Sequence, residues 1–278
     1  MKRYSKIIQQ SERSFKRQTG VSTDNFHQLL QQLRFHIAQL KIENPLKNRG
    51  LNGELSLEDK LLLTLYYIRH YPIFLLLGQI FNISESYANK IYHRIIDMIV
   101  KIAHVKGVKS LVNGTIKDIV VDVCEQPIER PKKGQKKYYS GKKKRHTIKA
   151  QLIVDTETKE IVSVHTGKGS QHDFKLFKDS RIAIDEDVKK RADLGYQGID
   201  RIYKNTIIPH KKSKNNPLSE EQKKENRESA KTRIVVEHVN RRCKIFRIVK
   251  EIFRGKHKNY HKTWNCVAGL VNMRWLMT

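Results

Sequence analysis

The sequence predicts a helical N-terminal domain followed by an α/β domain with a mixed sheet. Up to about residue 112, apolar residues recur at the spacing of amphipathic helices, whereas after Gly114 short β-branched runs alternate apolar and polar positions. The later segments follow the order strand, strand, strand, helix, strand, strand, helix, which is typical of an α/β or α+β domain with a mixed sheet. A chain of 278 residues is long enough for two modest domains. We therefore expect residues 1–112 and 113–278 to form separate domains.

The first part of the chain contains two strongly periodic helical segments. One covers residues 25–40 and could be capped by Thr23 or Asp24. The other begins at Ser56, carries acidic residues in its first turn, and runs to His70 before a proline. The apolar face of the first segment consists of Phe26, Leu29, Leu30, Leu33, Ile37 and Leu40.

A helix-turn-helix pattern follows these two helices. Residues 73–81 form a short apolar helix, residues 82–84 a tight turn, and Ser84 caps a helix from Glu85 to about Val100. In such a motif the second helix lies in the major groove of DNA. An ordinary helical hairpin would share the pattern, and the basic context favours DNA binding. The residues expected to contact DNA are Tyr87, Asn89, Lys90 and Arg94.

The second domain begins with a strand at residues 117–124. Its alternation places Ile119, Val121 and Val123 on one face, and Asp122 with Cys124 on the other. Further strands are predicted at 147–154, 160–166, 187–193 and 206–209, with a helix at 173–180 between the third and fourth strands. A long helix at 219–249 opens with the capping box of Ser219 and Gln222.

The charge of the chain points to a polyanionic partner. Lys and Arg number 56 against 28 Asp and Glu, giving a net charge of +28 and a sequence pI of about 10.0. Neutralising phosphates releases counterions, so this excess favours nucleic acid, although a solvated basic protein without that partner has the same composition. Three cysteines without Cys-x-x-Cys spacing favour a reducing, cytoplasmic setting. We see neither a signal peptide nor a membrane segment.

A basic stretch lies inside the second domain. Residues 125–150 contain ten Lys or Arg and two Glu, with Tyr138 and Tyr139 among them. We expect a loop that follows a phosphate backbone, with the tyrosines able to stack on bases, although a plain solvated loop is the alternative. The densest part of the stretch is Lys142, Lys143, Lys144 and Arg145.

Three acidic residues could hold catalytic metal ions. Asp122 interrupts an apolar strand, where a carboxylate is costly unless it is paired or bound to metal. Asp193 follows a predicted strand and precedes two glycines, and Glu237 lies on the long helix with Arg233 and Lys244 on the same face. The alternatives are a solvent-facing edge-strand aspartate, a turn-capping aspartate and an exposed salt-bridge ladder. Two divalent metals held by carboxylates are suited to phosphodiester cleavage.

Other candidate groups are weaker. His172 and Asp173 lie at the start of a predicted helix and could support the three acids from behind. His257 and His261 have helical spacing but lack a companion ligand, so we do not expect zinc. No G-x-x-x-x-G-K-[ST] phosphate loop occurs, which argues against a nucleotide cofactor. Nothing singles out a nucleophilic Ser or Tyr of a recombinase.

These blocks resemble the DDE transposases of the bacterial insertion sequence five group. The resemblance rests on the runs 119–122 and 127–131, the basic run 139–146, the runs 169–173 and 192–198, and the spacing of Arg233, Glu237 and Lys244. It covers nearly the whole chain, including the helix-turn-helix segment. The chain departs from the family pattern at Ala230, where a Tyr is frequent, and at Cys124 and Glu125, where Gly or Thr is common.

The resemblance implies a fold and an activity. The fold would be RNase H-like, with a mixed five-stranded sheet and helices. Two Mg²⁺ ions, with Mn²⁺ as a substitute, would be held by Asp122, Asp193 and Glu237, while Arg233 and Lys244 hold phosphates. The partners would be double-stranded DNA, namely the element's terminal repeats and a target site, and further copies of the chain in a homodimer or higher assembly at the nucleoid. The alternatives are a non-catalytic, domesticated DNA-binding protein and an RNase H-like nuclease.

Overall fold

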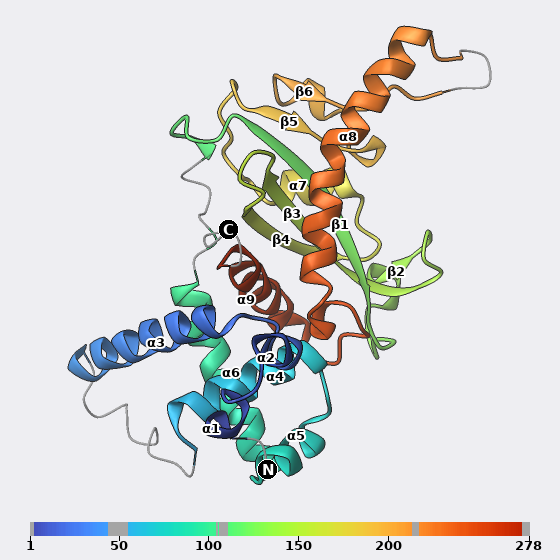
Figure 1. The fold of residues 1–278 in the computed structure, drawn as a ribbon. Helices are drawn as coiled ribbons and strands as arrows, with labels where there is room; N and C mark the ends of the chain where they lie inside the picture. The colour runs from blue at the N-terminus through green and yellow to red at the C-terminus, as the bar shows by residue number, and fades with distance from the viewer. Residues whose placement is uncertain (1–2, 44–54, 104, 106–110, 213–216, 274–278) are drawn as a thin grey trace. The chain divides into compact units, whose positions relative to one another are not determined.

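The computed structural model describes residues 3–43, 55–103, 105, 111–212 and 217–273 (Figure 1). Two compact units are present, and neither is continuous in sequence. The first comprises residues 1–104, 244–250 and 265–278, and the second comprises residues 105–243 and 251–264. The two continuous domains expected from the sequence differ from these units in where residues 105–112, 244–250 and 265–278 belong.

The first unit is built from helices. They are α1 (Tyr4–Ile7), α2 (Glu12–Thr19), α3 (Thr23–Glu43), α4 (Leu57–His70), α5 (Phe74–Phe81) and α6 (Glu85–Ile102), joined by the part of α9 (Tyr260–Met273) that starts at residue 265. The core includes Phe15 of α2, whose ring meets that of Phe26 edge to face with centroids 5.4 Å apart. No helix in the described parts of the chain combines the length and apolarity that a membrane span requires.

Capping residues set where these helices begin. Ser56 accepts a hydrogen bond from the backbone N–H of Asp59 at 3.1 Å and starts α4, as predicted. For α3 the prediction of Thr23 or Asp24 as the cap was wrong. Thr23 is the first helical residue, and Ser22 accepts from the N–H of Asn25 at 3.2 Å. The helix therefore starts before the first residue of its predicted range.

The helix-turn-helix consists of α5, a turn and α6. Asn82 adopts the left-handed conformation with φ 56°, and the backbone N–H of Ile83 donates to the carbonyl of Gly78 at 3.0 Å. A Cβ at Gly78 would lie 2.6 Å from the Ile83 carbonyl oxygen, so only glycine allows the turn to close against α5. Ser84 then caps α6 through the N–H of Tyr87 at 3.2 Å. The predicted motif is confirmed as a local structure.

The second unit contains a mixed sheet. Its strands are β1 (Asp118–Pro127), β2 (Tyr139–Ser140), β3 (Arg145–Asp155), β4 (Ile161–Lys168), β5 (Lys189–Arg191) and β6 (Thr206–Ile207). Five of the strands run in the order β4, β3, β1, β5 and β6, antiparallel on the β4 side of β1 and parallel on the β5 side. This arrangement is RNase H-like, as predicted. The expected number of five strands is one too few, because the two-residue β2 also pairs with β3.

Helices cover both faces of this sheet. Ile119 and Val121 of β1 face an apolar cluster that contains Phe177 of α7 (Asp173–Asp179) and Tyr196. The opposite face of β1 contacts α8 (Glu220–Cys243), which runs along it in Figure 1. The side chains of α8 that are buried in its second half recur at intervals of three and four residues: Val236, Val239, Asn240 and Cys243.

The long helix ends earlier than its sequence pattern predicts. Its start is as expected, because Ser219 and Gln222 exchange the two hydrogen bonds of a capping box at 3.2 and 3.1 Å. Its last residue is Cys243, and a turn follows at Lys244. Phe246 is fully buried in the first unit, where its ring packs against Gly20. Burying that ring requires the chain to leave the helical path, which local periodicity does not reveal.

Candidate active site

Asp122 lies in the middle of β1 on the face that α8 covers. Asn240 of α8 donates from Nδ2 to Oδ2 of Asp122 at 2.7 Å. Burial raises the pKa of Asp122 above its ordinary value, and the negative charge of Asp193 raises it further. A backbone hydrogen bond at Val123, the charge of Arg233 and the Asn240 amide act in the opposite direction. Asp122 pairs with Leu152 of β3 and is half-buried, whereas the pairing of β1 with β5 ends at Val120.

Asn240 is a site residue that the sequence analysis missed. Its Oδ1 accepts a hydrogen bond from the Cys124 thiol at 3.0 Å while its Nδ2 serves Asp122. A carboxylate only accepts hydrogen bonds, so the amide must present nitrogen to Asp122 and oxygen to Cys124. The side chain therefore fixes the orientation of the Asp122 carboxylate. Its position one helical turn after Glu237 was the available signal.

Asp193 comes close to Asp122 through the parallel pairing of β1 and β5. The last paired residues are Val120 and Arg191, and each aspartate follows its strand's pair by two residues. Carboxyl ends of neighbouring parallel strands meet at one edge of a sheet, where ligand sites are frequent. Oδ1 of Asp193 accepts from the backbone N–H of Gly195 at 2.8 Å and caps the short turn of 3₁₀ helix that follows.

A third carboxylate, Asp173, lies beside Asp193. A Cβ at Gly195 would lie 2.9 Å from Oδ1 of Asp193 and 3.1 Å from Oδ2 of Asp173, so both carboxylates flank this glycine. Lys149 of β3 donates from Nζ to Oδ1 of Asp173 at 2.8 Å and to the carbonyl of Gln171 at 2.7 Å. His172, named with Asp173 as a supporting residue, precedes the first residue of α7 and forms no side-chain cap.

Tyr196 is a second residue that the sequence analysis missed. Its side chain is 1% exposed, and its hydroxyl donates to Oε1 of Gln151 at 3.4 Å. Burial raises the pKa of Tyr196 well above its ordinary value, and the charges of Asp173, Asp122 and Asp193 raise it further. A neutral phenol therefore lies within electrostatic reach of three carboxylates. It adds no negative charge to a region that already holds several.

Glu237 and Arg233 lie one turn apart on α8. Arg233 is half-buried and close enough to Asp122 to lower its pKa, whereas Glu237 is exposed. The predicted helical face is shorter than expected, because Lys244 follows the last residue of α8 and belongs to the first unit. The place of Glu237 in a metal site stays a prediction.

The chemistry of the paired acids suits a divalent cation. Asp122 and Asp193 supply oxygen ligands, which Mg²⁺ prefers, and a cation between them would relieve the repulsion that raises the pKa of Asp122. Over the residues that the structure describes, no three His, Cys, Asp or Glu side chains lie together closely enough to hold a metal ion. Of the three predicted ligands, Asp122 and Asp193 therefore lie near each other, and Glu237 is not grouped with them in the described structure.

The residues predicted to contact DNA are mostly accessible. On α6, Lys90 is exposed and Tyr87 and Asn89 are half-buried. Arg94 is also half-buried and lies near Lys60: burial lowers the pKa of Lys60, and the charge of Arg94 lowers it further. The basic run forms the turn between β2 and β3 rather than a long loop. All four of its residues are exposed, namely Lys142, Lys143, Lys144 and Arg145.

Comparison with known proteins gives two matching families and two relatives. Residues 121–272 match the family described as "DDE superfamily endonuclease", and residues 53–103 match "Helix-turn-helix of DDE superfamily endonuclease". A protein of Microchaete diplosiphon, described as a probable transposase for insertion sequence element IS702, is 38% identical over 271 residues, which cover 96% of each chain. A protein of Streptomyces albus G, described as a putative transposase for insertion sequence element IS112, is 26% identical over 229 residues, covering 81% of this chain and 83% of its own. No solved structure matches the chain significantly.

Proposed function

The chain belongs to the transposases of the DDE endonuclease superfamily, and from this premise we propose that it cuts DNA at the ends of an insertion sequence and joins them to target DNA. The observation that supports this most directly is the nearness of Asp122, inside β1, to Asp193, which follows β5, because the charge of Asp193 raises the pKa of Asp122. Helix α8 adds Asn240 and Arg233 on one side of that pair. Such an arrangement can receive a scissile phosphate together with cations.

The proposed reaction has two steps at one site. In the first, water attacks the phosphorus at the element's end, the bond from phosphorus to the 3′ oxygen breaks, and a 3′-OH is freed. In the second, that 3′-OH attacks a phosphorus of the target strand, a new phosphodiester bond forms, and the target's own 3′ oxygen leaves. Each step exchanges one oxygen for another at phosphorus, so neither needs a nucleotide or a redox partner.

Each protein group has a proposed role in these steps. Asp122, Asp193 and Glu237 would hold two Mg²⁺ ions, or Mn²⁺ in their place. When bound, the ions supply positive charge that activates the attacking oxygen and stabilises the leaving one. Asn240 keeps the Asp122 carboxylate oriented through its 2.7 Å hydrogen bond. Arg233 offsets negative charge near Asp122 and would contact the bound phosphate.

We also propose how DNA is held. Helix α6 would read the terminal repeats in the major groove, and the exposed run from Lys142 to Arg145 would hold backbone phosphates of any sequence. Two ends must be processed together, which calls for a homodimer or higher assembly working at the nucleoid. This division of labour rests on the helix-turn-helix family match at residues 53–103.

The experiment is cleavage of a duplex that carries the element's own ends. We expect Asp122→Asn, Asp193→Asn and Glu237→Gln each to lower strand cleavage by at least about 100-fold, because each removes a charged ligand but keeps the side-chain size. Binding of the same duplex should stay near that of the unaltered chain. Glu228→Gln is the matched control, since Glu228 is exposed on the same helix.

Three results would contradict the proposal or a part of it. Full cleavage by any one of the three acid variants would remove that residue from the site. Robust cleavage in EDTA would exclude metal-dependent chemistry, and specific end binding without cleavage under any metal would favour a non-catalytic DNA-binding protein.

A further inference from the structure

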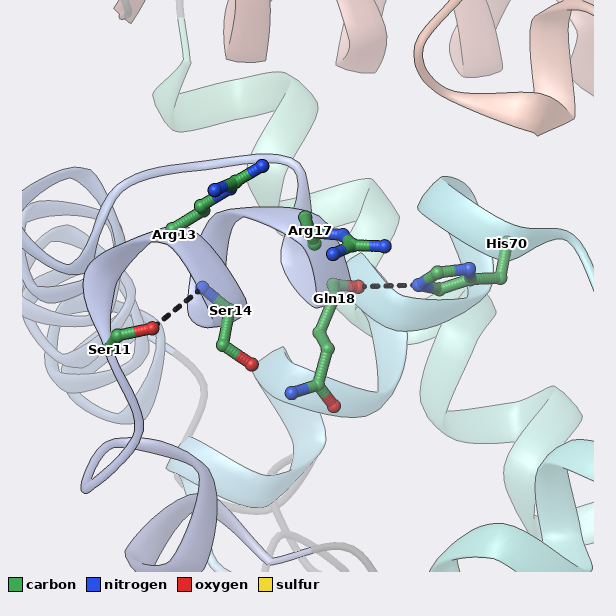
Figure 2. Close-up of a pocket in the computed structure, with 6 residues that line it drawn as sticks. All are labelled: Ser11, Arg13, Ser14, Arg17, Gln18 and His70. Atoms are coloured by element: carbon green, nitrogen blue, oxygen red, sulfur yellow. Dashed lines mark hydrogen bonds between the residues drawn. The ribbon is translucent and has the colours of Figure 1, made fainter.

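Helix α2 carries a cluster of cations that belongs neither to the helix-turn-helix of α5 and α6 nor to the carboxylate site around Asp122. Arg13, Lys16 and Arg17 are all exposed on this eight-residue helix. Arg13 and Arg17 line two pockets of about 570 and 460 Å³, both within the roughly 300–1,000 Å³ range of ligand-binding clefts. Figure 2 shows the first of these, with both arginines projecting from α2 above Gln18 and His70.

Three guanidinium groups converge at the second pocket. Arg69, near the end of α4, donates to the carbonyl of Ile245, and its Nε is buried with no hydrogen-bond partner among the described residues. Burial lowers the pKa of Arg69, and the charges of Arg247 and Arg17 lower it further. Like charges held this close repel one another, and a bound anion would relieve that repulsion.

No carboxylate in the described lining is free to be that anion. The only acidic residue lining either pocket, in the part of the chain that the structure describes, is Glu12. Its carboxylate already accepts from the hydroxyl of Thr23 at 2.7 Å and from the Thr23 backbone N–H at 3.3 Å, and it lies 3.9 Å from the Lys16 ammonium. The described lining of these two pockets therefore supplies no carboxylate that is aimed at Arg13, Arg17 and Arg69.

The location of the cluster suggests which anion this is. Nε2 of His70, the last residue of α4, is 3.1 Å from the carbonyl oxygen of Gln18, which fixes α2 against the end of α4. Helix α5, the first helix of the helix-turn-helix, starts at Phe74, four residues later. When the second helix of such a motif enters the major groove, neighbouring elements meet the sugar-phosphate backbone. Arginine suits this contact, because its planar fork matches phosphate oxygens.

We propose that Arg13, Arg17 and Arg69, here called the α2 arginine cluster, bind backbone phosphates of the DNA that α6 reads. The inference rests on the proposed function for the presence of DNA, and it adds a contact surface that is separate from α6 and from the run Lys142–Arg145. These contacts carry no sequence information and set the register of the helix-turn-helix on the duplex.

The test is the salt dependence of binding to a random-sequence duplex by the full chain. For Arg13→Gln with Arg17→Gln, the slope of log Kobs against log salt should become shallower by about 0.9 for each phosphate that the variant no longer neutralises. Both side chains are exposed, so the fold should be kept. The matched control is Lys6→Gln with Lys41→Gln, two exposed cations of the same unit whose removal changes the net charge equally and should leave the slope unchanged.

The outcomes separate this inference from the proposed function. A slope equal to that of the unaltered chain, or an equal change in the control, would overturn the cluster as a phosphate site. An unchanged slope with a changed oligomeric state in light scattering would also overturn it and assign the cluster to an acidic protein surface. If the chain failed to cleave element ends with Mg²⁺, the proposed function would be contradicted, but the salt-slope result for the α2 arginine cluster would still hold.

Discussion

At the scale of single residues, burial and the nearby charge of Asp193 make the ionised form of Asp122 costly in the folded chain. The pKa of Asp122 is raised in the folded chain, so the folded state takes up a proton at this site more readily than the unfolded state does. The stability that this stronger proton binding gives the folded chain is fully present below the pKa of Asp122 in the unfolded state, about 3.9. It is lost as the pH rises through the pKa of Asp122 in the folded state. The ionised carboxylate at neutral pH therefore destabilises the metal-free protein.

Asp122→Asn should accordingly stabilise the metal-free chain at neutral pH. The amide keeps an oxygen that can accept from Asn240, and it removes the buried charge. The gain in unfolding free energy should be present at pH 7 and vanish below about pH 4, each unit of raised pKa being worth roughly 1.4 kcal/mol. Urea unfolding in EDTA at the two pH values measures this.

Asn240→Leu is the opposing variant for the same measurement. It removes the amide that serves both Asp122 and Cys124, which should cost about 1–3 kcal/mol because buried polar groups lose their partner. Equal effects of Asp122→Asn at both pH values would show that packing, and not charge, governs this position.

At the residue scale, the sequence points to a candidate where the residue type itself carries the chemistry. Asp122 could be identified because a carboxylate inside an apolar strand is costly, and Asp193 because glycines follow it. Asn240, Tyr196 and the Asp173–Lys149 ion pair depend on which elements pack together, and no local pattern reports that. For Asn240 the one signal was its place one helical turn after Glu237, because an asparagine on a mostly polar helix does not stand out by its type.

At the scale of elements, the proposal assigns base reading to α6 and phosphate binding to the basic turn between β2 and β3, and the two can be tested separately. Asn89 of α6 is partly accessible, and one good bidentate contact to a base is worth about 1–3 kcal/mol of discrimination. Asn89→Ala should therefore reduce the preference for element ends over random duplex. Lys143→Gln with Lys144→Gln should weaken both duplexes alike and make the salt slope shallower by about 0.9 for each phosphate left without its lysine.

Competition binding with labelled ends and unlabelled random duplex separates the two effects. If the lysine variant loses end preference while the Asn89 variant keeps it, sequence reading belongs to the β2–β3 turn instead of α6. Arg94 is the less informative position on α6, because it is half-buried next to Lys60.

At the element scale, capping residues predicted the starts of three helices correctly. Ser56, Ser84 and the Ser219–Gln222 box each start a helix at the predicted place. The end of α8 was misplaced because Phe246 is buried against Gly20, more than two hundred residues earlier in the chain. The two-residue β2 was missed because it is too short to show alternation.

At the scale of the whole molecule, the first unit takes residues from both ends of the sequence. Phe246 packs on Gly20, a Cβ at Gly269 would lie 2.5 Å from the carbonyl oxygen of Ala103, and Nδ2 of Asn25 donates to the carbonyl of Met273 at 3.4 Å. Residues 1–104 alone would thus expose apolar surface that residues 244–250 and 265–273 bury.

A fragment of residues 1–112 should consequently unfold at a lower temperature than the same unit in the full chain. Each large apolar side chain missing from a core typically costs about 2–5 kcal/mol, and Phe246 alone is of that kind. Thermal unfolding followed by circular dichroism measures the difference, and Phe246→Ala in the full chain is the companion variant. A fragment as stable as the intact unit would show that the C-terminal segments merely rest on it.

The closure of the first unit by residues 244–273 has a consequence for the timing of biosynthesis. A ribosome releases α2 to α6 first, then the entire sheet with its paired acids, and only afterwards the segments that complete the core around Gly20 and Ala103. Units fold as cooperative wholes, so the first unit, with its helix-turn-helix, should complete its fold only after the whole sheet has been translated. Chains interrupted before residue 244 would lack the segments that complete the first unit. In ribosome-stalled chains of that length, residues 1–103 should therefore be readily cut by protease.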